Sequence, residues 1–445
     1  MIKVAKFGGS SLADAGQFRK VKDIVNAEEA RKFIVASACG KRNKDDHKIT
    51  DLLYLCEAHL KYGVSYDDIF SMIEDRYLEI KKELGLSIDI ESEFEKIRGL
   101  VSKSVPVDYL VSRGEYITSR CLAEYLDADF VDASDVIAFD YDGQVNLKRS
   151  AELLEPYCSG RRKVVIPGFY GCMPNGAIRL MPRGGSDITG AVVANIVGAD
   201  IYENWTDVSG IMVTDPKIVR NPLHIKRINY AELREMSYMG ANVLNDEAIF
   251  PVKQKNIPIN IRNTNQPDDP GTMIMEDCSE LDAVDPPHYI TGITRKVGYT
   301  AMTVLKSHSS SDIGFMRKAL QIFEEYGLSI ESIPVGVDSF SLIVSTEAVE
   351  PYLFEIIGKL RKDLGADDVT VMDGLAMLAI VGRGMKAKIG ISGQIFSELG
   401  KNGINIKTIS QGSDEISIIV GVEAESCDDA IRAIYNKFVG KGAEK

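Results

Sequence analysis

Two segments of this chain combine a pair of adjacent glycines with a basic residue just before it. The first is "KFGGSS" at residues 6–11, directly after the apolar run "MIKVA", and the second is "RGGSD" at residues 183–187. Adjacent glycines let backbone N–H groups close around an anion, and a helix that follows adds its positive N-terminal end. Either segment alone is also typical of a structural turn before a capped helix. Two of them in one chain favour a site for phosphate or carboxylate groups.

Two further polar segments carry groups that could bind substrate. In "NWTDVSGIMVTDPKIV" at 204–219, Thr206 and Asp207 offer acceptors for a nucleotide and Lys217 could contact its phosphates. Read alone, the segment also fits an Asx turn followed by a loop that ends at proline. In "SRGEYITSRCLAEYL" at 112–126, Glu115 lies in the first turn of an amphipathic helix, where an acidic residue commonly serves the helix dipole. Glu115 is a candidate only because other possible site residues occur in the same chain.

The elements around these segments alternate between strands and helices. From residue 1 to about 265, short β-branched runs such as "IKVAKF" and "KFIVAS" alternate with helical stretches, which predicts a largely parallel sheet covered by helices. The four polar segments lie at the expected carboxyl ends of strands, where open α/β sheets bind ligands. The charged stretch from about 60 to 105 has helical spacing and predicts an inserted helical pair that forms a solvated lid or a dimer surface.

The second half of the chain contains an internal repeat. Residues 265–288 are acidic and proline-rich, which predicts a connecting segment. Beyond it, "GLSIESI" at 327–333 matches "GINIKTI" at 403–409, and "DSFSLIV" matches "DEISIIV" at the same offset of 76 residues. This period predicts a duplicated small α/β domain and not a solenoid. The similar runs at 298–304 and 374–382 predict interleaving, with the second copy borrowing its first strand from before the first copy.

Composition narrows the possible function classes. A net charge of −13 and a pI near 5.1 argue against nucleic-acid binding. The sequence has neither a leader nor an apolar run of ~18 residues, so we expect a cytoplasmic protein with no membrane contact. Seven scattered cysteines fit a reducing compartment, and five scattered histidines argue against a zinc site. "GRGMKA" at 382–387 matches a weak dinucleotide fingerprint, but Lys407 stands where an acidic residue is needed, so we interpret the match as accidental.

The ordered set "KFGGSS", "SRGE", "RGGSD" and "WTDVSGIMVTDP", followed by two ACT-like repeats, resembles the aspartate kinases of the amino-acid kinase family. The resemblance implies an α/β fold: a carbamate-kinase-like three-layer αβα sandwich with a mainly parallel central sheet, followed by two ferredoxin-like βαββαβ ACT domains. The expected domains are a catalytic domain at 1–288 with a helical insertion at about 60–105, a first ACT domain at 307–373, and a second ACT domain at 289–306 plus 374–445. With the chain ending at Lys445, we expect no fused homoserine dehydrogenase.

The same resemblance implies that the chain transfers the γ-phosphoryl group of MgATP to the side-chain carboxylate of L-aspartate. The product is 4-phospho-L-aspartate, in the committed step toward lysine, threonine and methionine. The carboxylate nucleophile is ionised at neutral pH, so no strong general base is required. Magnesium would be held mainly by nucleotide phosphates and water, so no protein residue is assigned as a metal ligand. Other kinases of this fold, and a non-catalytic amino-acid sensor, stay open as alternatives.

Site roles follow from the resemblance, residue by residue. The catalytic set would be Lys6, Gly8, Gly9 and Asp187, with Asp187 positioning Lys6 and the substrate. Glu115 would orient the aspartate amino group, Arg183 would clamp its α-carboxylate, and Ser37 and Thr50 would contact substrate. The nucleotide site would comprise Lys6, Phe7, Gly8, Gly9, Ser10, Thr206, Asp207, Met212 and Lys217. The chain departs from relatives in the longer, more charged loop "CGKRNKDDHKI" before Thr50, in Met212 where tyrosine is common, and in Lys217 where arginine is common.

The ACT-like pair implies feedback control by an end-product amino acid that binds between subunits. The expected effector-lining residues are Gly314, Phe315, Met316, Ile330 and Glu331. Glu331 would pair with a cationic ligand, which favours lysine, although it also fits an exposed strand charge and threonine stays possible. Val335 and Gly336 stand where lysine-inhibited relatives have hydroxyl residues, so the effector stays open. We expect a homodimer or homotetramer formed through the ACT domains.

Overall fold

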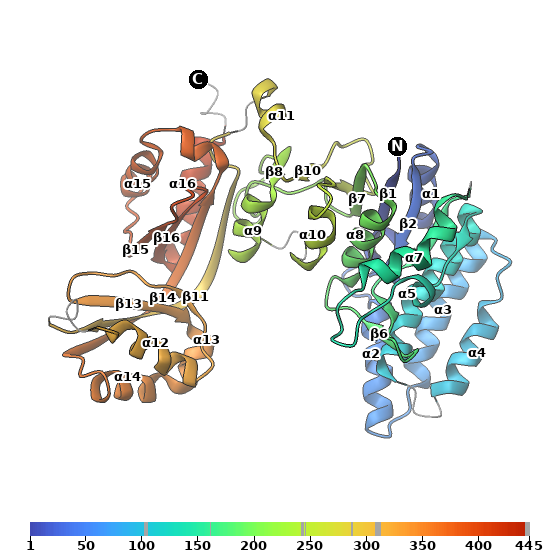
Figure 1. The fold of residues 1–445 in the computed structure, drawn as a ribbon, viewed down its shortest axis with the longest axis horizontal. Helices are drawn as coiled ribbons and strands as arrows, with labels where there is room; N and C mark the ends of the chain where they lie inside the picture. The colour runs from blue at the N-terminus through green and yellow to red at the C-terminus, as the bar shows by residue number, and fades with distance from the viewer. Residues whose placement is uncertain are drawn as a thin grey trace. The chain divides into compact units, whose positions relative to one another are not determined.

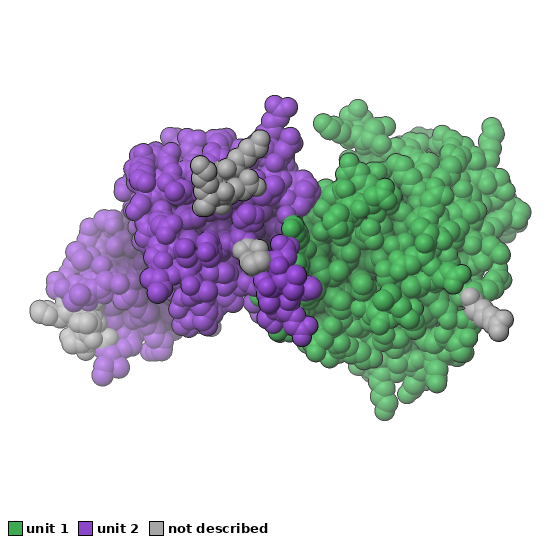
Figure 2. Space-filling view, turned by 90° about the horizontal axis from the view of Figure 1, so that it is seen from above, with its two compact units in different colours: residues 1–211, 226–230, 243–278 green, residues 212–225, 231–242, 279–445 purple. Residues whose placement is uncertain are grey.

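The computed structural model describes residues 1–101, 106–160, 162–241, 244, 246–285, 288–307 and 313–440. The chain forms two compact units, which are traced along the ribbon in Figure 1 and coloured separately in Figure 2. The first comprises residues 1–211, 226–230 and 243–278, and the second comprises residues 212–225, 231–242 and 279–445. Among the described residues, no helix has the length and apolar character needed to cross a membrane.

The first unit is built on an eight-stranded sheet of order β3-β4-β2-β1-β7-β9-β10-β8. All strand pairs are parallel except β9 with β10. Central strands are buried on both faces, which explains continuous apolar runs such as "FIVA" in β2. The strands are β1 (Lys3–Phe7), β2 (Arg31–Ala36), β3 (Asp129–Phe130), β4 (Val164–Pro167), β7 (Ile201–Thr206), β8 (Arg227–Asn229), β9 (Ile259–Asn263) and β10 (Thr272–Met275). The predicted mainly parallel sheet is confirmed.

Helices cover both faces of this sheet. α1 and α5 share one core cluster with Ala5 and Phe7 of β1, whereas α8 faces the alternate residues of β1 and β7. The predicted helical stretch contains α3 and α4, whose apolar sides join the cluster of α1 and α5. The helices are α1 (Ala15–Asn26), α2 (Ile49–Lys61), α3 (Asp67–Leu84), α4 (Ile90–Val101), α5 (Val107–Leu126), α6 (Ala133–Val136), α7 (Leu147–Cys158), α8 (Gly185–Val197) and α10 (Asp246–Lys253). A 3₁₀ turn, η1 (Gly9–Leu12), follows β1, and β5 (Tyr170–Cys172) pairs with β6 (Ile178–Leu180).

The second unit carries a six-stranded antiparallel sheet of order β12-β13-β11-β14-β16-β15. Its strands are β11 (Gly292–Leu305), β12 (Ile330–Ser332), β13 (Ser339–Ser345), β14 (Asp368–Val381), β15 (Thr408–Gln411) and β16 (Ser417–Glu423). Its helices are α11 (Ser279–Val284), α12 (Phe315–Glu325), α13 (Thr346–Val349), α14 (Leu353–Lys362), α15 (Ile391–Lys401) and α16 (Cys427–Phe438). α9 (Tyr230–Tyr238) begins at the last residue of a first-unit segment and continues in the second unit.

The internal repeat is visible in the geometry of the second unit. Gly314 and Gly390, which are 76 residues apart, both have φ 83° and cap the starts of α12 and α15. The residues before them, Ile313 and Ile389, are both 98% exposed. Equivalent positions in the two sequence copies therefore have the same backbone conformation and exposure.

The two long strands β11 and β14 each serve both copies. Residues 299–305 of β11 pair with β13 of the first copy, whereas residues 292–297 pair with β14 alone among the strands. Gly298 (φ 85°) and Gly374 (φ 72°) lie at the change-over in each strand. The pairing therefore divides β11 at Gly298, whereas the sequence assigned all of residues 289–306 to the second copy. The remaining domain limits stay predictions.

Candidate functional site

Lys6 lies near the carboxyl end of β1 and points toward the start of α8. Its Nζ is 2.6 Å from Asp187 Oδ1 and donates a longer hydrogen bond of 3.4 Å to Asn204 Oδ1. Asn204 Nδ2 in turn donates to Asp187 Oδ1 at 2.9 Å. β1 and β7 pair in parallel with Lys6 in register with Asn204, so the three side chains meet on one face of the sheet. The predicted pairing of Lys6 with Asp187 is thus present.

The turn after β1 is packed against two other backbone segments. The Gly8 amide donates to the Trp205 carbonyl at 2.9 Å, and Ser11 Oγ donates to the same carbonyl at 3.4 Å. A Cβ atom on Gly9 would lie 2.9 Å from the Ala38 carbonyl oxygen, so only glycine fits there. Of the two glycine amides expected to bind phosphate, only that of Gly9 has no hydrogen-bond partner among the described residues. Gly9 and Ser10 start η1, so their amides are the ones left for an anion.

Close packing also defines the start of α8. Gly184 adopts φ 86°, and a Cβ atom on Gly185 would lie 2.6 Å from Met181 Cβ. The helix therefore begins with a left-handed residue followed by one with no room for a side chain, which sets Asp187 in its first turn. Tyr202 Oη donates to the Asp187 carbonyl at 3.1 Å, so β7 holds this turn at its backbone as well.

Glu115 is a buried carboxylate that lacks a full set of partners. The sequence placed Glu115 in the first turn of its helix, but α5 begins at Val107, so Glu115 lies in the middle of the helix and the acidic residue of the first turn is Asp108. Glu115 is 3% exposed, and its Oε2 has no hydrogen-bond partner within the part of the chain that the structure describes. Burial raises the pKa of Glu115 to about 8, against the opposing effect of a hydrogen bond donated by the Ala38 amide. Ala38 also contacts Gly9 through its carbonyl, so one residue connects Glu115 to the glycine turn. An incoming ammonium group would satisfy this carboxylate.

The segment after β2 contains the other two substrate candidates, Ser37 and Thr50. Ser37 donates its amide to the Phe7 carbonyl at 3.1 Å, and Ile49, beside Thr50, donates to the Cys39 carbonyl at 3.1 Å. The long charged loop between them is anchored by Asp46, which accepts from Arg76 of α3 at 2.6 Å. Burial opposes ionisation of Asp46, but hydrogen bonds from Arg42 and the charge of Arg76 hold its pKa well below the usual range.

Arg183 and the nucleotide candidates have more open positions. Arg183 is exposed in the loop before α8, in the same turn that sets Asp187. Thr206 ends β7 and donates to Asp207 at 3.1 Å, and Asp207 is exposed. Met212 and Lys217 belong to the second unit, so their contribution to the nucleotide site stays a prediction.

The expected effector residues lie in the first repeat of the second unit. Gly314 caps α12, and Phe315 is buried with its ring 5.5 Å from that of Phe340. Met316 and Ile330 are half-buried. Glu331 of β12 is paired with Lys296 of β11 at 3.2 Å, and the Lys296 ammonium lies 4.2 Å from the centre of the Tyr238 ring.

The weak dinucleotide match "GRGMKA" has a structural explanation. Arg383 Nη1 donates to Glu232 of α9 at 2.7 Å, and Arg383 Nε donates to Asp282 of α11 at 2.7 Å. The segment forms the short 3₁₀ turn η4 (Arg383–Ala387) and not a phosphate loop followed by a long helix. This agrees with the interpretation of the match as accidental.

The sequence did not single out three residues of this region. Asn204 bridges Lys6 and Asp187; its signal is a polar residue within a buried strand. Gly40 packs against Gly9, where a Cβ atom would lie 2.5 Å from the Gly9 carbonyl carbon. Phe169, between β4 and β5, has φ 76°, an uncommon backbone conformation for a bulky residue. Nothing in the sequence around Phe169 signals that conformation.

Comparisons with known proteins give the following. The model of the amino acid kinase family matches residues 1–263, and an ACT domain model matches residues 378–438. Aspartokinase 3 of Bacillus subtilis (strain 168) is 35% identical, covering 98% of this chain and 98% of that protein. Chloroplastic aspartokinase 1 of Arabidopsis thaliana is 26% identical over 99% of this chain and 80% of its own length.

Solved structures give the same picture. The crystal structure of Clostridium acetobutylicum aspartate kinase, described as an allosteric enzyme, is 47% identical with a TM-score of 0.89, covering 98% of this chain and 99% of that chain. E. coli aspartokinase III in complex with aspartate and ADP shares the fold, at 24% identity and a TM-score of 0.73, covering 98% of this chain and 99% of that chain.

Proposed function

Because this chain belongs to the amino acid kinase family and, within it, to the aspartokinases, we propose that the site around Lys6 and Asp187 transfers a phosphoryl group from ATP to the side-chain carboxylate of L-aspartate. The observation that carries the assignment of the site is the contact of 2.6 Å between Lys6 and Asp187, beside a glycine turn and α8. A cation, free amides and a helix start converge there, which suits the transfer of a polyanionic group.

The phosphoryl donor would lie along the turn after β1. Lys6 and the amides of Gly9 and Ser10 would offset the negative charge of the transferring group, which grows as an anion attacks a polyanion. Asp187 would hold Lys6 in place until the phosphoryl group arrives. Mg²⁺, held mainly by nucleotide phosphates and water, would neutralise further charge. Asp187 suits its outer contacts because Lys6 and Asn204, its side-chain partners among the described residues, both contact Oδ1.

The acceptor would be oriented by groups on α5, α2 and the loop before α8. Glu115 would receive the ammonium group of aspartate, because its buried carboxylate has an oxygen with no partner in the described structure. Arg183 would pair with the α-carboxylate, and Ser37 and Thr50 would contact the substrate near the glycine turn. These contacts leave the side-chain carboxylate free to attack, and most of the rate gain would come from positioning.

A coupled assay of ADP release tests the substrate and the site together. We expect release that depends on L-aspartate, and little with L-glutamate or with no acceptor. Lys6→Ala should lower kcat about 100-fold or more with a smaller change in KM, because its interaction strengthens as charge develops. Wild-type-like turnover by Lys6→Ala would refute the role of Lys6, and activity with glutamate alone would indicate a different acceptor.

The second unit would confer feedback control by an end-product amino acid, with lysine as the favoured effector. The support is the cationic partner that Glu331 already has in Lys296, since a lysine ligand would offer the same ammonium group. We further propose a homodimer or homotetramer in which effector sites form between ACT domains. Repeating the ADP assay with lysine, with threonine and with both would identify the effector, and no response to either would argue against this control.

A further inference from the structure

The side chain of Asn204 links the two groups to which the transfer chemistry is assigned. Its amide oxygen accepts from Lys6 Nζ at 3.4 Å, and its amide nitrogen donates to Asp187 Oδ1 at 2.9 Å. The residue is 5% exposed, so this contact is shielded from bulk water. The reverse orientation of the amide would point its N–H groups at the lysine ammonium, so the neighbouring charges fix the orientation observed.

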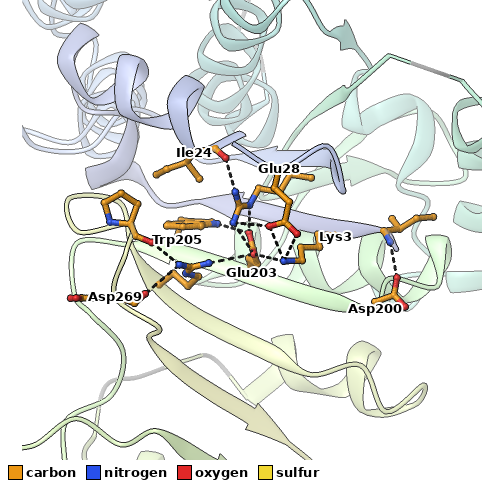
Figure 3. Close-up of polar contacts among 11 residues, drawn as sticks. Lys3, Ile24, Glu28, Asp200, Glu203, Trp205 and Asp269 are labelled. Carbon is orange, nitrogen blue, oxygen red and sulfur yellow. Dashed lines mark hydrogen bonds and ion pairs between the residues drawn. The ribbon is translucent and has the colours of Figure 1, made fainter. Parts of the chain in front are cut away.

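Asn204 reaches this position because its neighbours on β7 are held on the opposite face. Figure 3 shows Glu203 at the centre of a cluster of polar contacts, and Glu203 itself is buried. Arg31 Nε donates to Glu203 Oε2 at 2.7 Å, and Trp205 Nε1 donates to the same oxygen at 3.0 Å. Since side chains alternate along a strand, anchoring Glu203 and Trp205 on one face directs Asn204 to the other, toward α8. The register of β1 with β7 then places Lys6 beside it.

We propose that Asn204 is a positioning residue that holds the Asp187 carboxylate so that Lys6 is paired but can be released to the phosphoryl group. With Asn204 present, Asp187 Oδ1 is shared between two donors, and Lys6 does not hold it alone. Without the amide, Lys6 would be the one partner left to the Asp187 carboxylate among the described side chains, and the pair would tighten. This inference rests on the proposed roles of Lys6 and Asp187.

The first test compares Asn204→Leu with a matched control. Asn195 of α8 is 6% exposed and donates its side-chain amide to the Pro251 carbonyl at 2.7 Å, away from Lys6. We expect Asn204→Leu to lower kcat about 10-fold or more while KM for MgATP and for aspartate changes less than about 3-fold, because binding groups are retained. Asn195→Leu should lower thermal stability by a similar amount and leave kcat near wild type. Equal loss of kcat in both variants would overturn the proposal.

The second test uses the pH profile of Asn204→Asp. The groups facing this position are Lys6 from β1, Asp187 from α8 and the phenol of Tyr202 on the same strand, while its partner in register on β9 is the apolar Ile261. Two adjacent carboxylates cannot both ionise freely, so at low pH they would share a proton that takes over the donor role of the amide. The kcat of Asn204→Asp should therefore be highest at low pH and fall as pH rises, relative to wild type. A profile parallel to wild type would contradict the proposal.

The Lys6→Ala variant distinguishes a wrong role for Asn204 from a wrong assignment of the whole site. If Lys6→Ala loses turnover but Asn204→Leu keeps it, the positioning role of Asn204 is wrong and the role of Lys6 stands. If Lys6→Ala turns over like wild type, the assignment of the site itself is wrong, and the role of Asn204 is refuted with it.

Discussion

At the scale of single residues, the environment of Glu115 bears on the role proposed for it in binding the acceptor. The carboxylate is buried, its pKa is raised to about 8 by that burial, and one oxygen has no partner among the described residues. A neutral carboxyl group attracts an ammonium group far less than an ionised one does. Binding of an amino acid there therefore requires the site to release a proton, which ties substrate affinity to pH.

The pH dependence of aspartate binding follows from this. We expect KM for aspartate to fall as pH rises toward about 8, because Glu115 has to ionise before it can pair with the ammonium group, and to level off above it. Glu115→Gln should raise KM for aspartate and remove this dependence, since an amide does not titrate in that range. Initial rates measured across aspartate concentrations from pH 6 to 9 check this. A wild-type KM that does not vary over the range would contradict it.

Part of the residue-scale picture could be predicted from the sequence, and part could not. The glycine pairs predicted anion turns because adjacent glycines have a distinct chemical use. Asn204 gave a weaker signal, a polar residue within a buried strand, which does not indicate what its side chain contacts. Gly40 gave none, because it is required only where the backbone of Gly9 packs against it. Likewise, the Gly8 amide donates to the Trp205 carbonyl and is therefore not available to an anion. This hydrogen bond depends on the pairing of β1 with β7, which no local sequence pattern encodes.

At the scale of elements, helix α3 supports the site without contributing a predicted site residue. Arg76 Nη1 donates to the Gly40 carbonyl at 3.1 Å, and Tyr77 Oη donates to the Gly114 carbonyl at 2.8 Å. These two glycines flank the glycine turn and Glu115, respectively. The sequence predicted helices over about 60–105 from their spacing, and α3 and α4 lie there, while residues 102–105 are outside the described residues. The lid or dimer surface stays a prediction. The contacts of α3 with the site could not be predicted, because periodicity does not show contacts between distant segments.

Gly40 offers a test of this packed arrangement. In Gly40→Ala the new methyl group would lie 2.5–2.7 Å from backbone atoms of Gly9 and Ser10, which cannot yield as a flexible side chain would. We expect loss of about 1–3 kcal/mol of unfolding free energy and a strong fall in kcat. Gly99→Ala in α4, where the new methyl group meets nothing within 4 Å, should be neutral or slightly stabilising. Denaturant unfolding and the ADP assay check both variants. A Gly40→Ala variant with the stability and kcat of Gly99→Ala would contradict the packing argument.

At the scale of the whole molecule, the chain joins a kinase unit to a duplicated regulatory unit. Alternating strands and helices predicted the parallel sheet, and the 76-residue offset predicted the repeat; both are confirmed. The division of β11 at Gly298 was not predicted, because a single glycine within a strand is equally typical of a bulge and does not by itself indicate a change of partner. Coupling between the units has to begin where an effector changes a contact within the regulatory sheet.

At the proposed effector site, the pair between Glu331 and Lys296 would be such a contact. If a lysine effector binds Glu331, it has to displace Lys296, which lies 3.2 Å away. Lys296→Met removes the competitor, so the lysine concentration that gives half-maximal inhibition should fall severalfold. Glu331→Gln should raise it, because the charge that attracts the ammonium group is lost. Rates measured with and without lysine in both variants check this, and inhibition curves identical to wild type would place the effector elsewhere.

The strands shared between the two repeats also determine the order in which the sheet can form during synthesis of the chain. Residues 292–297 leave the ribosome before any of the first repeat, yet the strand with which they pair in the described structure is residues 376–381, which follow all of it. The backbone hydrogen-bonding groups of residues 292–297 therefore stay unpaired until residues 376–381 have been synthesised. Pairing over such a sequence distance is intrinsically slow. A chain halted between the repeats would contain all the strands that pair within the first copy, but residues 292–297 would still lack their strand partner. The sheet that begins with residues 292–297 is therefore completed only when residues 376–381 have been synthesised.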